Sequence, residues 1–151
     1  MKIVAHTMKY CGGAVSSDLE TTIYNANDYD EYKLIYEDCF REMRASLELM
    51  PVDCCDSREK LLSESTKIFI LRNNTKLIGS VSIYDNEIDD LIVAKEFQNK
   101  GYGKKLLIFA VAKMQKENVS PIILHVTDWN KAAINLYLKN GFTISKTEIF
   151  N

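Results

Sequence analysis

Two glycines, Gly101 and Gly103, lie in a segment whose residue types could bind an anion. The segment reads Gln98-Asn99-Lys100-Gly101-Tyr102-Gly103 and connects an apolar stretch to an amphipathic one of helical period. Glycines let the backbone turn its N–H groups inward, and a helix start adds unpaired N–H donors at the positive end of the helix dipole. Such a turn can hold a diphosphate, although two glycines can also serve only to shape a turn.

The spacing of these residues excludes two familiar phosphate loops. A dinucleotide-binding loop requires a third glycine where this chain has Leu106, and it opens a parallel strand-helix-strand unit. A Walker loop requires glycine in place of Gln98, and serine or threonine in place of Lys105. An anion site at this turn would therefore belong to another class.

A second group of chemically useful residues lies in the segment 130–140, which is predicted to be a helix ended by Gly141. Asn130 and Tyr137 are seven residues apart, so they share a helix face with Ala133 and could contact one ligand. Packing of the Tyr137 ring in the core is the alternative.

The elements that position these residues follow from hydrophobic period and capping signals. Asp28 and Glu31 have the spacing of a capping box, which predicts a helix that starts there and ends at Pro51. Further helices are predicted from 56 and over 103–117 and 130–140, and strands over 2–7, 67–72, 76–84, 87–93, 122–126 and 142–150. Strands paired first as hairpins and then alternating with helices predict a mixed sheet with helices on both faces.

Length and composition predict one domain over residues 1–151, because 46% apolar and 26% charged residues are ordinary values for a globular chain. The formal net charge of −2, without a basic stripe, argues against nucleic acid as a partner. The sequence shows neither a signal peptide nor an apolar run of membrane-spanning length, which predicts a cytoplasmic protein without a membrane partner. Four cysteines lack metal-ligand spacing and are interpreted as reduced and structural.

Two motifs together resemble the GNAT superfamily of acyl-CoA-dependent N-acyltransferases. The first is Gln98-x-x-Gly101-x-Gly103, preceded by Leu91-Ile92-Val93 and followed by Leu106-Leu107. The second is Val126 followed by Asn130-x-x-Ala133-x-x-Leu136-Tyr137-x-x-x-Gly141-Phe142. Their order in the chain agrees with that of the family, and the resemblance covers about the C-terminal half.

This resemblance implies an α/β fold of mixed α+β type, with a mostly antiparallel sheet of six or seven strands whose fourth and fifth strands splay apart. It implies acetyl-CoA as cosubstrate, without a metal. The pantetheine arm would bond to the backbone of the fifth strand at Leu91, Ile92 and Val93. The diphosphate would rest on the N–H groups of Gln98, Asn99, Lys100, Gly101, Tyr102, Gly103 and Lys104. Asn130 would contact the pantetheine arm, and Tyr137 would donate to the sulfur as the thiol leaves.

Acyl transfer to an amine also requires a proton acceptor. An alkyl amine with a pKa of about 10.4 is mostly protonated at neutral pH, and freeing it costs roughly 4 to 5 kcal/mol. Glu87 is the first choice for the acceptor, and Asp89 and Asp90 are its neighbours; an ordinary solvated turn charge is the alternative for Glu87.

The predicted function is therefore an N-acetyltransferase that moves an acetyl group from acetyl-CoA to a primary amine by direct transfer. The acceptor would be an amine-bearing small molecule or peptide, and the protein a monomer or homodimer. Acidic residues of the first two helices could steer a cationic acceptor, namely Glu37, Asp38, Glu42, Glu48, Asp53 and Asp56. The alternatives are a non-catalytic acyl-CoA-binding regulatory domain and a purely structural interaction domain.

Overall fold

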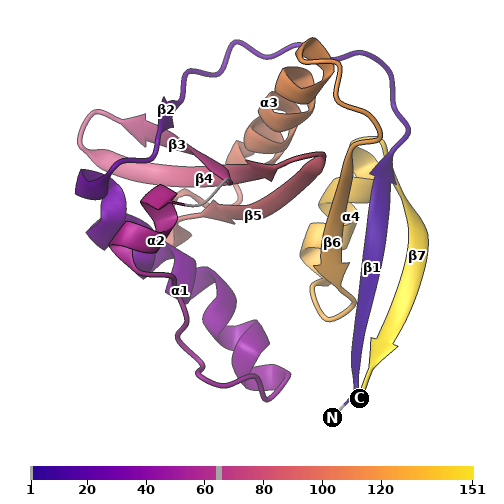
Figure 1. Ribbon diagram of the computed structural model, residues 1–151, viewed down its shortest axis with the longest axis horizontal. Helices are drawn as coiled ribbons and strands as arrows, with labels where there is room; N and C mark the ends of the chain where they lie inside the picture. The colour runs from indigo at the N-terminus through magenta and orange to yellow at the C-terminus, as the bar shows by residue number, and fades with distance from the viewer. Residues whose placement is uncertain (1, 64–65) are drawn as a thin grey trace.

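The computed structural model describes residues 2–63 and 66–151, which form one seven-stranded sheet with helices on both faces (Figure 1). The strands are β1 (Ile3–Tyr10), β2 (Thr22–Ile23), β3 (Lys67–Asn73), β4 (Lys76–Tyr84), β5 (Glu87–Val93), β6 (Ile123–Thr127) and β7 (Phe142–Phe150). Their order across the sheet is β2-β3-β4-β5-β6-β1-β7. Every neighbouring pair is antiparallel except β5 and β6, so the predicted mixed, mostly antiparallel sheet is confirmed.

The helices divide between the two faces of this sheet. They are α1 (Tyr29–Ser46), α2 (Arg58–Ser63), α3 (Tyr102–Lys116) and α4 (Lys131–Lys139), with short 3-10 turns at Ala26–Asp28 and Lys95–Phe97. On one face, α3 and α4 cover a core that includes Val81, Leu107 and Phe142. On the other face, α1 and α2 cover a smaller core that includes Tyr32 and Ile92. None of the helices in the described ranges is long and apolar enough to cross a bilayer.

The N-terminal strand β1 lies between β6 and β7, and the chain then crosses to the opposite edge of the sheet to form β2 (Figure 1). The crossing segment 11–21 is held to α3 by Gln115, whose carboxamide accepts from the Val15 N–H (3.0 Å) and donates to the Gly13 carbonyl (3.1 Å). The sequence analysis did not predict β2, because two exposed residues carry no readable period.

The start of α1 corrects the predicted capping box. Asn25, not Asp28, is the capping residue: its side chain accepts from the backbone, and its N–H donates to the Asp28 carboxylate at 2.9 Å. Asp28 makes no capping hydrogen bond to α1, and Glu31 accepts instead from Arg72 (2.9 Å) and from the Leu77 N–H (3.0 Å). The observed pair Asn25 and Asp28 has the same three-residue spacing as the predicted pair Asp28 and Glu31. The sequence pattern alone therefore could not show which pair forms the capping box. Helix α1 also ends at Ser46, earlier than predicted.

The sheet opens between β5 and β6. These strands pair only at Glu87 with Ile123 and at Ile88 with Leu124, and beyond that point they diverge (Figure 1). The fourth and fifth strands, which the resemblance predicts to splay, are instead paired from Tyr84 opposite Glu87 to Gly79 opposite Val93. The difference is one of numbering, because 87–93 and 122–126 are the fourth and fifth of the predicted strands and become β5 and β6 when β2 is counted.

Candidate active site

The edge of β5 that faces the opening carries backbone groups that no neighbouring strand pairs beyond Ile88. The Ala94 N–H donates to the Ile78 carbonyl of β4. Because the backbone groups of successive residues in a strand point in opposite directions, the N–H and carbonyl of Val93 point into the opening. The Val93 carbonyl accepts from the Gln98 Nε2 (2.9 Å) and from the Cys39 thiol (3.4 Å). The predicted pantetheine edge at Leu91, Ile92 and Val93 therefore borders the opening.

Helix α1 covers one side of this opening and contacts both strands that border it. Cys39 reaches Val93 of β5, and one turn further on the Met43 sulfur accepts a hydrogen bond from the Thr127 hydroxyl of β6 (3.3 Å). Burial raises the pKa of the Cys39 thiol above its usual value, so the thiol stays protonated. A protonated thiol is a weak nucleophile, which argues against an acyl-cysteine intermediate at this position.

The loop between β5 and α3 presents an uncapped helix start, as the glycine motif predicts. Asn99 (φ 63°) and Gly101 (φ 88°) have left-handed backbones, and Gly101 precedes α3 without a side chain that caps its first N–H groups. A Cβ atom at Gly103 would have only Leu136 within 4 Å, at 3.6 Å, so there is space beside this helix start. These features fit a diphosphate, which supplies the acceptors that the helix start lacks.

The aromatic and basic residues of this loop pack against one another. The Tyr102 ring meets Phe97 edge-on at 6.1 Å, and the ammonium groups of Lys100 and Lys105 lie over the Phe97 and Tyr102 rings at 5.8 and 5.3 Å. These contacts fix the outer wall of the loop. Gln98 is drawn inward by its hydrogen bond to Val93, so its side chain ties the loop to β5.

Helix α4 contributes Asn130 and Tyr137. The Asn130 Oδ1 caps the helix by accepting from the Ala133 N–H at 3.2 Å, which leaves its two Nδ2 protons as donors. The Tyr137 ring lies 6.0 Å from Phe142, and its hydroxyl hydrogen-bonds to none of the described residues. Burial, with a smaller contribution from Asp89 and Asp90, raises the pKa of Tyr137 to about 12. Its hydroxyl is therefore a donor.

Of the three carboxylates on β5, Asp90 has the properties of a proton acceptor. Asp90 has a left-handed backbone (φ 44°) where the pairing of β4 and β5 is irregular, between Ser82 opposite Asp89 and Ser80 opposite Ile92. Burial first, and then the negative charges of Asp89, Asp56 and Glu87, raise the pKa of Asp90 to about 7. A bulge of this kind depends on the pairing of two strands, so the sequence could not rank Asp90 above its neighbours.

Glu87, the first choice of the sequence analysis, lies at the closed end of the opening. Its carboxylate pairs with the His125 Nε2 of β6 at 2.9 Å, and His125 also hydrogen-bonds Thr7 at 3.0 Å. The pKa of Glu87 is raised above its ordinary value, mainly by burial. His125 offsets part of this rise, and the negative charge of Asp89 adds a smaller increase. The Glu87 carboxylate is thus engaged by an imidazole, whereas Asp90 forms no ion pair with the described residues, which favours Asp90 as the acceptor.

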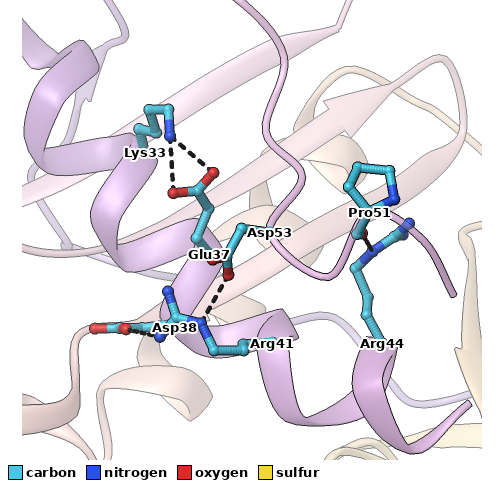
Figure 2. A network of polar contacts seen from close by, with 7 residues as sticks. All are labelled: Lys33, Glu37, Asp38, Arg41, Arg44, Pro51 and Asp53. Carbon is cyan, nitrogen blue, oxygen red and sulfur yellow. Dashed lines mark hydrogen bonds and ion pairs between the residues drawn. The ribbon is translucent and has the colours of Figure 1, made fainter. Parts of the chain in front are cut away.

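The loop from α1 to α2 is fixed by ion pairs of α1 (Figure 2). Arg41 binds both Asp38 (2.8 Å) and Asp53 (2.7 Å), and the Arg44 Nε donates to the Pro51 carbonyl at 2.8 Å. Four of the six acidic residues that could steer a cationic acceptor are thus paired with local cations, since Lys33 also binds Glu37 (2.8 Å) and Lys60 binds Asp56 (3.3 Å). Of these pairs, the one between Arg41 and Asp53 joins α1 to the loop.

Comparisons with known proteins identify the family of this chain. Residues 29–142 match the Acetyltransferase (GNAT) family. Streptothricin acetyltransferase A of Bacillus subtilis is 30% identical over 86 residues, which cover 54% of this chain and 49% of that protein. This chain therefore spans about half the length of that curated relative.

Solved structures share the fold at low sequence identity. A GNAT-family protein from Novosphingobium aromaticivorans has a TM-score of 0.72 and 17% identity, and the match covers 99% of this chain and 63% of that chain. The PaiA N-acetyltransferase of Thermoplasma acidophilum, solved with coenzyme A, has a TM-score of 0.66 and 20% identity, with coverage of 85% and 92%. With the family match spanning most of its length, this chain belongs to the GNAT acetyltransferase family.

Proposed function

We propose that this chain is an N-acetyltransferase that moves an acetyl group from acetyl-CoA to a primary amine by direct transfer, within one domain over residues 1–151. The observation that carries the proposal is the grouping around one opening of the free β5 edge, the uncapped start of α3 and the Tyr137 hydroxyl. The structure of PaiA N-acetyltransferase with coenzyme A supports the same cosubstrate here.

Binding of the cosubstrate would use backbone groups. The N–H groups from Gln98 to Lys104 would meet the diphosphate, and the outward groups of Leu91 and Val93 would pair with the amides of the pantetheine arm. Asn130 would add a donor through Nδ2. These contacts would aim the thioester along β5, past Asp90 and Tyr137.

Transfer would begin when Asp90 accepts the proton of the ammonium. With an ammonium pKa of about 10.4, this transfer is uphill by about 5 kcal/mol to a carboxyl of pKa about 7, against about 9 kcal/mol for an aspartate of ordinary pKa. The raised pKa of Asp90 thus removes about 4 kcal/mol from the cost of freeing the amine. The neutral nitrogen then attacks the acyl carbon, the adduct loses its second nitrogen proton to solvent, and the carbon–sulfur bond breaks as the tetrahedral adduct collapses to the amide and the thiolate.

Tyr137 would assist the departure of the thiolate. Full proton transfer from a hydroxyl of pKa about 12 to a thiolate whose conjugate thiol has a pKa of about 8.5 is uphill by about 5 kcal/mol. The hydroxyl therefore stabilises the leaving sulfur by hydrogen bonding, and solvent supplies the proton to free CoA. A hydrogen bond of this kind strengthens only as charge develops.

The binding step is tested by replacing Gly103 with arginine. The long side chain would occupy the open surface where the diphosphate should lie, so we expect CoA affinity in calorimetry to fall at least about tenfold. Gly103→Ala is the matched control, because its methyl group makes only ordinary contact with Leu136. The fold should be retained or slightly stabilised in both, since glycine weakens a helix by about 0.5–1 kcal/mol relative to alanine. Unchanged CoA affinity in Gly103→Arg would refute the site.

The chemical step is tested by Tyr137→Phe. We expect kcat to fall about tenfold or more while the Kd for CoA changes less than about twofold, because the lost hydrogen bond acts on the barrier. Single-turnover release of free thiol and calorimetry measure the two quantities separately. A large loss of CoA affinity with unchanged kcat would assign Tyr137 to packing. Binding of acetyl-CoA without thiol release from any amine would instead favour a non-catalytic regulatory domain.

A further inference from the structure

His6 of β1 is a buried imidazole whose two ring nitrogens are both hydrogen-bonded. It is 9% exposed; its Nε2 lies 2.8 Å from the Asp128 Oδ1, and its Nδ1 lies 2.8 Å from the Thr147 hydroxyl oxygen. The hydrogen bonds from His6 and then from Lys131 lower the pKa of Asp128, so Asp128 is a carboxylate and can only accept. The Nε2 of His6 therefore donates to Asp128, which leaves the Nδ1 of the neutral ring as an acceptor for the Thr147 hydroxyl.

Asp128 connects His6 to the start of α4. It follows β6 directly, its N–H donates to the Val4 carbonyl of β1 at 2.8 Å, and its Oδ2 binds the Lys131 ammonium at 3.0 Å. Lys131 is the first residue of α4, and 70% of its side chain is exposed. Because exposed ion pairs contribute little, the hydrogen bond from the buried imidazole is the stronger of the two contacts that hold this carboxylate.

The turn 127–131 determines where α4 begins. The Asn130 N–H donates to the Thr127 carbonyl at 3.0 Å, and the Asn130 side chain caps the helix. Asp128 lies inside this turn, two residues before Asn130. Among the nine described residues of α4, Ile134 is the buried one, so the direction of this short helix depends on the contacts that hold the turn. A shift of the turn would move the whole helix.

We propose that His6 is a positioning residue of the acetyl-transfer site. Its hydrogen bond to Asp128 fixes the turn into α4, and the turn places the Asn130 amide for the pantetheine arm and the Tyr137 hydroxyl for the sulfur. This inference rests on the proposed acetyl transfer and adds a residue of the N-terminal strand, 122 positions from its partner in the sequence, that acts without touching the reactants. In the alternative, His6 serves packing and stability alone.

Two substitutions of His6 separate its two hydrogen bonds. The amide nitrogen of glutamine can take the place of the imidazole Nε2, so His6→Gln keeps a donor for Asp128. The shorter side chain in His6→Asn reaches only the position of Nδ1, so it loses Asp128 and keeps a group for Thr147. Thr147→Val is the matched control, because it removes the other hydrogen bond and keeps the shape of the side chain. All four proteins are compared at a temperature at which each is folded.

Trp129 provides a measurement that needs no cosubstrate. It is the only tryptophan of the chain, it lies between Asp128 and Asn130, and it is 40% exposed, so the quenching of its fluorescence by acrylamide reports the conformation of the turn. We expect the quenching constant to rise in His6→Asn, because the turn loosens. In His6→Gln and Thr147→Val it should stay close to the value of the wild type.

CoA binding and turnover test whether the turn serves the site. The Kd for CoA in calorimetry should rise about three- to tenfold in His6→Asn, the worth of one hydrogen bond, and His6→Gln should recover most of this loss. The kcat of His6→Asn should fall by about tenfold or more, because Tyr137 moves with the helix. Asp128→Ala breaks the same contact from the exposed side and should raise the Kd to a similar extent. Adding His6→Asn to Asp128→Ala should then raise it little further, which is expected of two residues that act through one contact.

The outcomes separate this inference from the proposed function. Equal losses of stability in His6→Asn and Thr147→Val, with unchanged Trp129 quenching and unchanged CoA affinity, would assign His6 to packing and overturn the inference. Fully additive effects of His6→Asn and Asp128→Ala on the Kd would also overturn it, and both results would leave acetyl transfer standing. A wild type that binds no CoA would refute the proposed function instead, and the quenching of Trp129 would still decide whether His6 holds the turn.

Discussion

Asp90→Asn is expected to remove most of the turnover and, at the same time, to stabilise the protein at about pH 8. A positioned general base typically contributes about 10²–10⁴-fold, and asparagine cannot accept the proton, so kcat should fall in that range. Asparagine tolerates the left-handed backbone that Asp90 adopts (φ 44°), so the bulge of β5 should remain.

The expected stabilisation follows from the direction of the pKa shift. The pKa of Asp90 is raised from 3.8 to about 7 on folding, so the native state binds more protons than the unfolded state between these values. The favourable contribution is fully present below about pH 4 and is lost as the pH rises through about 7. At about pH 8, the ionised group lowers the free energy of unfolding by up to about 4 kcal/mol relative to a neutral one.

The experiment measures the free energy of unfolding of Asp90→Asn and of the wild type at about pH 5 and about pH 8. We expect the advantage of the variant to be larger at the higher pH by about 3 kcal/mol, because the cost of ionising Asp90 grows over this range. Asp85→Asn is a matched control, since Asp85 is exposed and has a similar left-handed backbone (φ 53°). Loss of stability in Asp90→Asn at the higher pH, or retained turnover, would contradict the assignment.

Some elements of the candidate site are predictable from the sequence and others are not. The loop from Gln98 to Gly103 and the helix from Asn130 to Tyr137 are defined by spacing within one segment, and the structure has them as predicted. The roles of Glu87 and Asp90 depend on contacts between segments. Glu87 meets His125 because β6 lies parallel to β5, and Asp90 turns inward because the register of β4 and β5 shifts beside it. Neither the pairing of β5 with β6 nor the register shift between β4 and β5 can be inferred from the residue pattern within one segment.

The second large effect is expected from Arg72→Met, which should destabilise the protein by about 3–5 kcal/mol. The Arg72 guanidinium on β3 binds Asp28 at 2.6 Å and Glu31 at 2.9 Å, and Asp28 is only 4% exposed. Removing the cation leaves a buried carboxylate with the Asn25 N–H as its hydrogen-bond donor, and an uncompensated buried charge is costly. Because Asp28 and Glu31 lie at the start of α1, the substitution also loosens the helix that covers the opening.

Urea unfolding of Arg72→Met against Lys76→Met separates this buried pair from an ordinary surface one. Lys76 binds Glu96 at 3.2 Å with both side chains more than half exposed, so its loss should cost less than about 1 kcal/mol. Adding Asp28→Asn to Arg72→Met removes the unpaired charge and should recover a large part of the loss, a coupling expected only of residues in direct contact. Equal costs for the two methionine variants would show that Arg72 does not support α1. Because α1 carries Cys39 and Met43 to the two strands that border the opening, we expect acetyl transfer by Arg72→Met to fail at a lower temperature than by Lys76→Met.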